Sequence, residues 1–185
     1  SRLEAARQAT GEVLVVVDSH IEVYSSDWLM HLLLPILENP HTLSMQSLDI
    51  LDDLPGHKRN GAGGAQFGIV SDVFVFGYVA DRFGRKHVPA ETATKRLPYE
   101  SPFVPGSLFA IRRDEFWRLG GYDEGLRVWG GENTELALKV WRCSNGLGRA
   151  VVVPCSRVGH VYRIHMKETG RWPPPLPNAT THGLG

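Results

Sequence analysis

GGYDEGLRVWGGENTELALKVWRCSNGLGRAVVVPCSRVGHVYR, residues 120–163, is the stretch around which the rest of this chain can be interpreted. A glycine-rich loop leads into an amphipathic helix, which Asn133 or Thr134 is expected to cap. Residues 150–153 predict a short strand, and His160 follows that strand beside a glycine. One face of the helix is apolar and carries Leu136, Ala137, Val140 and Trp141.

The first forty residues show the order helix, strand, helix. Apolar residues at helical spacing predict a helix from Leu3 to Ala9, and the β-branched run at residues 12–17 predicts a strand buried on both faces. A second helix begins after a cap at Ser26 or Asp27, and Pro35 should kink or shorten it. This order is typical of an α/β sheet.

The later part of the chain predicts one domain over residues 1–166. The run Trp172-Pro173-Pro174-Pro175-Leu176-Pro177 is polyproline-like, so residues 167–185 are expected to form a disordered tail without a core of its own. The remaining predicted elements are strands at residues 42–50, 71–79 and 103–111, and a helix at residues 114–119 that Asp114 caps and that Gly120 and Gly121 end.

Composition limits the classes of function. The chain has 20 basic and 20 acidic residues, so its formal net charge is zero and it has no basic footprint for nucleic acid. The longest apolar run, residues 13–17, is far too short to cross a bilayer. The chain has no initiator Met and starts inside a predicted helix, so we expect it to be a piece of a longer protein.

The two cysteines, Cys143 and Cys155, are too few for a zinc site and lie in no CxxC motif. They either bridge each other or pair with cysteines outside this chain. The sequon Asn178-Ala179-Thr180 permits a luminal or secreted setting without proving one.

Asp18-Ser19-His20 follows the predicted strand at residues 12–17. Residues i and i+2 of extended backbone point the same way, so an Asp oxygen and a His nitrogen converge at the carboxyl end of this strand, where open α/β sheets bind ligands. This mixed pair suits a borderline divalent ion such as Mn²⁺, with ligand phosphates filling the remaining positions. Alternatively, Asp18 caps a turn and His20 is a surface histidine.

His160 is a candidate for the third metal ligand, because the glycine beside it lets the backbone approach a ligand closely. The alternative is a structural or exposed histidine. Five other histidines have no spaced partners and no assigned role: His31, His41, His57, His87 and His182.

Trp129, Glu132 and Asn133 lie at the start of the predicted helix. An indole can stack on a base or a sugar face, and a carboxylate and an amide supply the polar contacts that sugar hydroxyls need. Alternatively, Asn133 is only an N-cap and Trp129 belongs to the core.

Two further features fit a ligand or a simpler role. Gly106 and Ser107 follow Pro105 and offer backbone N–H groups to a ligand, although a simple turn explains them equally well. Arg163 can neutralise a diphosphate through a bidentate contact, or it can lie in solvent.

Together these motifs resemble the polypeptide N-acetylgalactosaminyltransferases, the GT-A enzymes that start mucin-type O-glycosylation. The resemblance covers roughly residues 1–163 and is weak between residues 39 and 99. The segments that carry it are Gly11–Leu14, Asp18–His20, Trp28-Leu29, Leu32-Leu33 and Pro105–Ala110. Its strongest part comprises Gly121–Asp123, Trp129–Asn133, Glu135-Leu136, Val140–Cys143 and Pro154–Arg163.

The resemblance implies a mixed sheet flanked by helices, with the amino-terminal nucleotide-binding part of the GT-A fold missing from this chain. It implies that Asp18, His20 and His160 hold Mn²⁺ against the diphosphate of UDP. The implied reaction is transfer of GalNAc from UDP-GalNAc to Ser or Thr hydroxyls of proteins, with retention at the anomeric carbon. The implied compartment is the Golgi lumen, with a membrane anchor upstream of this chain.

The resemblance also assigns roles to individual residues. Glu132 would act near the reacting centre, and both cysteines would pair with partners outside the region present here. The sequence departs from the family at Ile21, where a cysteine usually follows the Asp-x-His motif. The residues implied to contact the sugar-nucleotide donor are Ser19, Gly106, Ser107, Trp129, Asn133 and Arg163, although Gly-Gly is usual where Gly106-Ser107 stands.

Other functions stay open from the sequence. One is a catalytically impaired remnant that binds a sugar nucleotide or a protein partner, and another is a GT-A transferase that uses a different UDP-sugar. A metal hydrolase built on the same three ligands is disfavoured, because the sequence offers no obvious general base besides Glu132.

Overall fold

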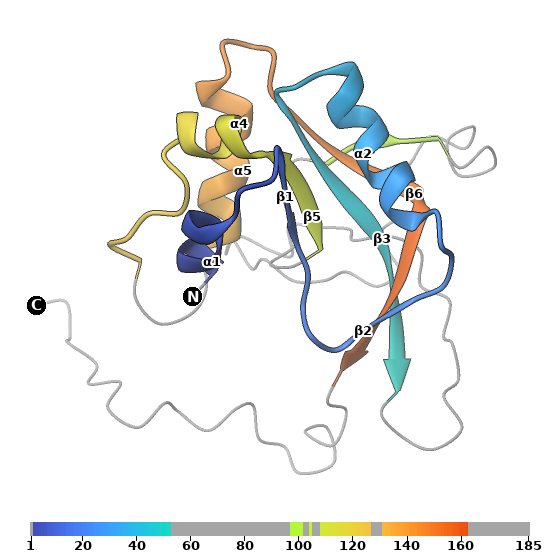
Figure 1. Cartoon of the computed structure of the whole chain (residues 1–185). Coiled ribbons are helices and arrows are strands. Elements are labelled where there is room, and N and C mark those ends of the chain that lie inside the picture. Colours follow the sequence, from blue (N-terminus) through green and yellow to red (C-terminus); the bar gives the residue numbers. More distant parts are fainter. Residues whose placement is uncertain (1, 53–96, 102–103, 105–107, 127–130, 163–185) are drawn as a thin grey trace, which may run out of the picture.

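The structure, a computed structural model, describes residues 2–52, 97–101, 104, 108–126 and 131–162 (Figure 1). The helices of these residues are α1 (Arg2–Gln8), α2 (Trp28–Glu38), α4 (Arg113–Arg118) and α5 (Glu132–Cys143). The strands are β1 (Val13–Val16), β2 (Ile21–Val23), β3 (Thr42–Asp52), β4 (Tyr99–Glu100), β5 (Phe109–Arg112) and β6 (Arg149–Tyr162).

The strands form one mixed sheet in the order β1-β5-β3-β6-β2, and β4 also pairs with β6. β3 and β6 run parallel, whereas the other neighbouring pairs are antiparallel. Helices α1, α4 and α5 lie on one side of the sheet and α2 lies on the other (Figure 1). The predicted α/β architecture, a mixed sheet flanked by helices, is therefore confirmed.

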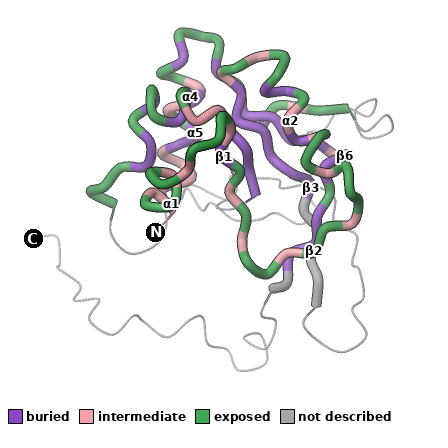
Figure 2. The backbone as a smooth tube through the Cα atoms, in the orientation of Figure 1, coloured by how far each residue is buried: buried purple, intermediate pink, exposed green. Residues whose placement is uncertain are grey.

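Alternation along β5 divides the core between the two faces of the sheet. Phe109 and Ile111 belong to the larger buried cluster, together with Leu136 of α5. Ala110, between them, belongs to the smaller cluster with Leu32 of α2. Figure 2 shows the buried residues concentrated in the central strands, between the two helical layers. The sheet is thus held from both sides, and its outer strands are where functional side chains can reach solvent.

β1 corrects the prediction of a strand buried on both faces. Leu14 is 6% exposed, but Val15 next to it is 36% exposed. The reason is position, since β1 is the end strand of the described sheet and pairs only with β5 among the described strands. The β-branched run at residues 12–17 therefore predicted a strand correctly, but this strand lies at the end of the described sheet and not in its centre.

β6 is much longer than the short strand predicted at residues 150–153. In its parallel register with β3, Gln46 pairs with Val153 but Ser47 pairs with Arg157, so three residues of β6 bulge out of the ladder. Pro154 is one of them, and it has no N–H to donate to a neighbouring strand. The sequence pattern therefore resembled the end of a strand, although pairing resumes beyond the bulge and carries His160 into the sheet.

The helix starts also differ from the predicted caps. α5 begins at Glu132, and its N-cap is Gly131 at φ 86°, so neither Asn133 nor Thr134 caps it. A positive φ favours glycine, which explains why this residue makes the turn into the helix. α4 begins at Arg113, one residue before the expected cap Asp114. The expected break after α4 is confirmed, since Gly120 has φ 85° and the next glycine φ 62°.

α2 begins directly after Asp27 and continues past Pro35 to Glu38, so the proline does not shorten it substantially. Trp141 packs, partly buried, against the larger hydrophobic cluster, and Trp28 packs in the same way against the smaller one. The predicted strand at residues 71–79 and the tail at residues 167–185 lie outside the described residues. None of the described helices is long and apolar enough to cross a membrane.

Candidate metal centre

The pairing of β2 with β6 brings the three candidate metal ligands together. Asp18 and His20 lie in the connection between β1 and β2. In the antiparallel ladder of β2 and β6, Ile21 lies opposite His160. His20 immediately precedes Ile21, so this register places the two histidines side by side. The local strand pairing therefore explains how residues so far apart in sequence meet.

The three side chains converge on one point. Oδ2 of Asp18 lies 3.3 Å from Nε2 of His160. The rings of His20 and His160 meet edge to face, with centroids 4.4 Å apart. One ligand atom from each of the three residues lies within 4.8 Å of the others. This spacing is compatible with three ligands of a single cation.

Burial favours the neutral form of the candidate ligand His160. His160 is 8% exposed, and this burial lowers the pKa of its imidazole; the neighbouring His20 lowers it further, while Asp18 opposes both effects. The neutral ring has a lone pair available for a metal, whereas the protonated ring has none. Two imidazoles and one carboxylate form a mixed nitrogen and oxygen donor set, which fits a borderline divalent ion such as Mn²⁺.

Arg2 contacts the site from α1, and the sequence did not reveal it. Its Nη2 donates a hydrogen bond of 3.0 Å to Oδ1 of Asp18, and its Nη1 lies 3.8 Å from Oε1 of Glu132. Nothing in the spacing of Arg2 distinguishes it from Arg7 on the same helix. The guanidinium group links the first candidate ligand to the candidate catalytic glutamate.

Tyr122 is a second residue near the site that sequence reasoning missed. Its side chain is buried, and its hydroxyl has no hydrogen-bond partner among the described residues. Burial raises the pKa of Tyr122 well above its ordinary value; the charge of Arg2 opposes this shift, and the charge of Glu132 adds to it. A neutral phenol therefore lies within electrostatic reach of the Arg2–Glu132 pair.

The other predicted site residues divide into two groups. Glu132 and Asn133 occupy the first turn of α5, and Oδ1 of Asn133 is buried without a hydrogen-bond partner among the described residues. Ser19 is exposed between Asp18 and His20. The predicted donor contacts that lie outside the described residues are Gly106, Ser107, Trp129 and Arg163.

Cys143 and Cys155 are both exposed, and no disulfide joins them in the described part of the chain. The alternative in which they bridge each other is therefore wrong. Cys143 ends α5 and Cys155 lies in the bulge of β6, so the two thiols belong to different parts of the fold.

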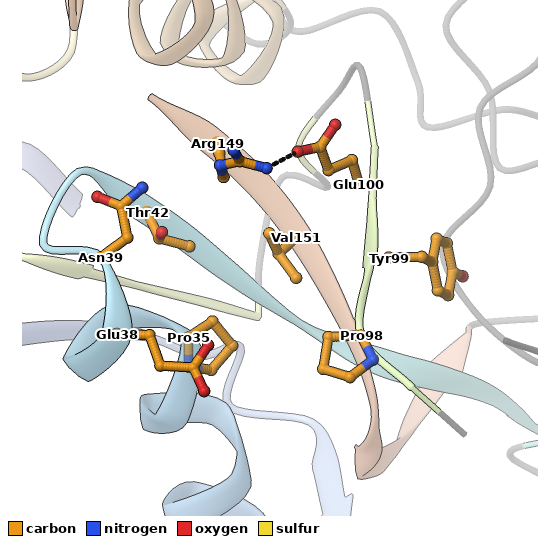
Figure 3. Close-up of a pocket in the computed structure, with 9 residues that line it drawn as sticks. All are labelled: Pro35, Glu38, Asn39, Thr42, Pro98, Tyr99, Glu100, Arg149 and Val151. Atoms are coloured by element: carbon orange, nitrogen blue, oxygen red, sulfur yellow. Dashed lines mark hydrogen bonds and ion pairs between the residues drawn. The ribbon is translucent and has the colours of Figure 1, made fainter. Parts of the chain in front are cut away.

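A separate hollow lies between the end of α2 and the strands β4 and β6 (Figure 3). An ion pair between Arg149 and Glu100 crosses its rim. Arg149 begins β6 whereas His160 lies near its other end, roughly 30 Å away at the usual rise of a strand. The hollow is therefore distinct from the metal centre, and none of the predicted site residues lines it.

Comparison with known proteins yields consistent family matches. The model described as "Glycosyl transferase family 2" matches residues 1–120, and the model described as "N-terminal domain of galactosyltransferase" matches residues 86–167. N-acetylgalactosaminyltransferase 6 of Drosophila melanogaster is 42% identical over 88% of this chain and 23% of its own length. Polypeptide N-acetylgalactosaminyltransferase 10 of Rattus norvegicus is 38% identical over 88% of this chain and 26% of its own length.

A solved structure extends the likeness to the fold. The crystal structure of GalNAc-T7 with UDP, GalNAc and Mn²⁺ matches with a TM-score of 0.69 and 34% identity, over 88% of this chain and 30% of that chain. The chain thus spans about a quarter of the length of its curated relatives. The GT-A-like fold and the family resemblance argued from sequence are both confirmed. Because the model of glycosyl transferase family 2 covers more than half of the chain, this protein belongs to that family, and the relatives named above that it resembles are N-acetylgalactosaminyltransferases.

Proposed function

We propose that this chain is the metal-binding part of a retaining glycosyltransferase that transfers GalNAc from UDP-GalNAc to Ser or Thr hydroxyls of proteins. The observation that carries the proposal is the convergence of Asp18, His20 and His160 on one point. The N-acetylgalactosaminyltransferase relatives support GalNAc as the sugar, and the GalNAc-T7 complex supports UDP and Mn²⁺ as the ligands. Glu132, which Arg2 links to the site, supplies the nearby carboxylate.

Asp18, His20 and His160 would hold Mn²⁺, which supplies positive charge against the diphosphate of the donor. The chain contributes two conditions for this. Burial lowers the pKa of His160, which favours the neutral ring that can ligate a metal. Oδ2 of Asp18 faces that ring, so the carboxylate and the imidazole are already arranged on the same side.

In the transfer, the bond between the anomeric carbon and the UDP oxygen breaks, and UDP leaves with the bonding electron pair. The acceptor oxygen bonds to the anomeric carbon on the face that UDP leaves, and its proton passes to the departing diphosphate. Glu132 can accept hydrogen bonds from sugar hydroxyls, which would orient the ring for this step. Ser19, Gly106, Ser107, Trp129, Asn133 and Arg163 remain proposed contacts to the donor.

The setting of the reaction is part of the proposal. A Golgi lumen location and O-glycosylated protein acceptors fit the family to which the chain belongs. Both are proposed for the full-length protein. A protein acceptor can be tested with Ser- and Thr-containing peptides, and the location by imaging a tagged full-length protein in cells.

Thermal unfolding of the 185-residue chain with Mn²⁺ and UDP tests the site. Ligands that bind only the folded state raise its stability, by about 2.7 kcal/mol at one hundred times Kd. We expect a higher Tm with both ligands together, and no shift would contradict the proposal. Transfer is then measured with the full-length protein, a Ser/Thr peptide and a panel of UDP-sugars. UDP binding without transfer would favour a non-catalytic binding protein, and preference for another donor would change the assigned sugar.

A further inference from the structure

The two oxygens of the Asp18 carboxylate have different partners. Oδ2 faces Nε2 of His160 at 3.3 Å, whereas Oδ1 accepts a hydrogen bond from Nη2 of Arg2 at 3.0 Å. One carboxylate oxygen therefore faces His160, and the other is held by the guanidinium group of Arg2. Its side chain is 21% exposed, so these partners and not bulk water set most of its orientation.

Arg2 reaches a second carboxylate from the same position. Its Nη1 lies 3.8 Å from Oε1 of Glu132, in the first turn of α5. A planar guanidinium group presents several donors in a fixed fork, so it can contact two carboxylates at once without a change of rotamer. Arg2 thus connects the loop before β2 to the start of α5.

Packing of α1 fixes where this guanidinium group lies. Leu3, Ala6 and Ala9 pack against the main hydrophobic cluster, on the side of the sheet that α5 also covers (Figure 1). Arg2 is itself 38% exposed, so it is not a core residue whose loss would unfold the chain. The packing of this short helix against the cluster therefore places the guanidinium group of Arg2 beside the site.

We propose that Arg2 is a positioning residue of the metal centre, which orients Asp18 so that Oδ2 is presented to the metal and which holds Glu132 beside it. This inference rests on the proposed metal-dependent transfer. Ligating carboxylates are commonly held by hydrogen bonds from outer partners, and loss of such a partner typically lowers metal affinity about 10- to 100-fold. Because Arg2 also contacts Glu132, its loss would affect the orientation of both the Asp18 and the Glu132 carboxylates.

Electrostatic repulsion between Arg2 and the metal would act in the opposite direction. The sign of the change in Mn²⁺ affinity therefore distinguishes the two effects. A guanidinium charge near a divalent cation repels it, and this repulsion alone would make removal of Arg2 increase metal affinity. Glu132 lies 3.8 Å from the guanidinium group and already offsets part of its charge, so the repulsion between Arg2 and a bound cation is weaker than that of a lone guanidinium group. We therefore expect orientation to dominate over repulsion.

The test measures Mn²⁺ affinity of the 185-residue chain without any donor, by following free Mn²⁺ in electron paramagnetic resonance. Three variants are compared: Arg2→Met, Arg2→Lys and the control Arg7→Met. Arg7 lies on the same helix but pairs with Glu4 and Glu124, away from the metal centre. Lysine keeps the positive charge but lacks the fork that reaches two carboxylates.

We expect Arg2→Met and Arg2→Lys each to weaken Mn²⁺ binding about 10- to 100-fold, and Arg7→Met to leave it unchanged. Circular dichroism checks that all variants are folded. Unchanged or tighter binding by Arg2→Met would overturn the positioning role and leave the proposed function standing. Failure of the unmutated chain to bind Mn²⁺ would overturn the metal centre and this inference together.

Discussion

Oδ2 of Asp18 lies 3.3 Å from Nε2 of His160, although 142 positions separate the two residues in the chain. Two features of the fold produce this contact. The bulge in β6 lets the strand continue beyond Pro154, and the pairing of β2 with the second half of β6 then sets His160 opposite Ile21. A change in either feature would move an imidazole away from the carboxylate, so the metal centre depends on strand register.

His160→Ala should lower Mn²⁺ affinity by more than about 100-fold, because it removes a ligand and not merely a partner of one. Isothermal titration of the folded variant with Mn²⁺ measures this. His31→Ala is the matched control, since His31 lies on α2 and pairs with Asp27 at 3.1 Å. Equal Mn²⁺ affinity in the two variants would exclude His160 from the site.

Glu132→Gln should reduce transfer about 100-fold while leaving Mn²⁺ affinity within a few-fold of the unmutated value, because the charge near the reacting centre is lost but the proposed ligands stay. Initial rates of GalNAc transfer by the full-length protein give the first quantity, and a metal titration gives the second. Glu135→Gln is the control on the same helix, where Glu135 pairs with Lys139. Transfer that depends equally on both glutamates would refute the assigned role of Glu132.

Substitution of Glu115 should change the stability of the fold, in contrast to the substitutions above, which act on metal binding or transfer. It is 4% exposed, and its carboxylate accepts hydrogen bonds from Arg118 and from the hydroxyl of Ser144. Nδ1 of His41 lies 3.0 Å from its Oε2. These contacts tie α4 to the end of α5 and to the start of β3. Glu115→Gln should therefore lower the free energy of unfolding by about 2 kcal/mol, as expected when hydrogen bonds to a charged group are lost.

The same residue gives this stabilisation a pH dependence. Burial raises the pKa of Glu115, but hydrogen bonds from Arg118 and Ser144 and the close approach of His41 outweigh it, and the folded-state pKa lies below the ordinary value of 4.5. The unfolded chain therefore binds a proton more readily than the folded chain does. The contribution of Glu115 is fully present above pH 4.5 and is lost as the pH falls through its folded-state pKa.

Urea unfolding at pH 7 and at pH 3, for the unmutated chain and for Glu115→Gln, measures both effects. The difference in the free energy of unfolding between the unmutated chain and Glu115→Gln should be smaller at pH 3 than at pH 7. Glu38→Gln serves as the control, because Glu38 is exposed at the end of α2 and its substitution should change stability by no more than about 0.5 kcal/mol. A difference that grows as the pH falls would contradict the assigned network.

The sequence predicted the candidate ligands because their signals are local. Asp18 and His20 are two residues apart, so they stay close together, although Ser19 and His20 lie in a bend and not in the extended backbone on which the prediction was based. His160 was already a candidate third ligand because a glycine lies beside it after a predicted strand, and the family resemblance then implied the same role. Their actual meeting point required the pairing of β2 with β6, which the sequence does not specify, because strand register depends on long-range packing.

The features that the sequence did not predict all involve contacts between distant elements. Arg2 has the same local surroundings as any arginine on an exposed helix face, and only the packing of α1 brings it to Asp18 and Glu132. His41 had no spaced partner in the sequence, yet folding places it beside Glu115, 74 positions later in the chain. The length of β6 was missed because a proline bulge resembles a strand end.

Gly148 connects α5 to β6 and offers a test of that junction. A Cβ at this position would lie 1.8 Å from the carbonyl oxygen of Val140 and 2.8 Å from Cβ of Ser144, and a backbone atom cannot yield as a flexible side chain can. Gly148→Ala should therefore lower the free energy of unfolding by about 3 kcal/mol, at the upper end of the usual cost of overpacking. Gly146→Ala is the control: its Cβ would meet nothing within 4 Å, but its φ of 79° should still cost about 1 kcal/mol. Urea unfolding of both variants measures the two decreases in the free energy of unfolding. A larger decrease for Gly146→Ala would mean that α5 does not approach this junction with β6 as closely as the structure shows.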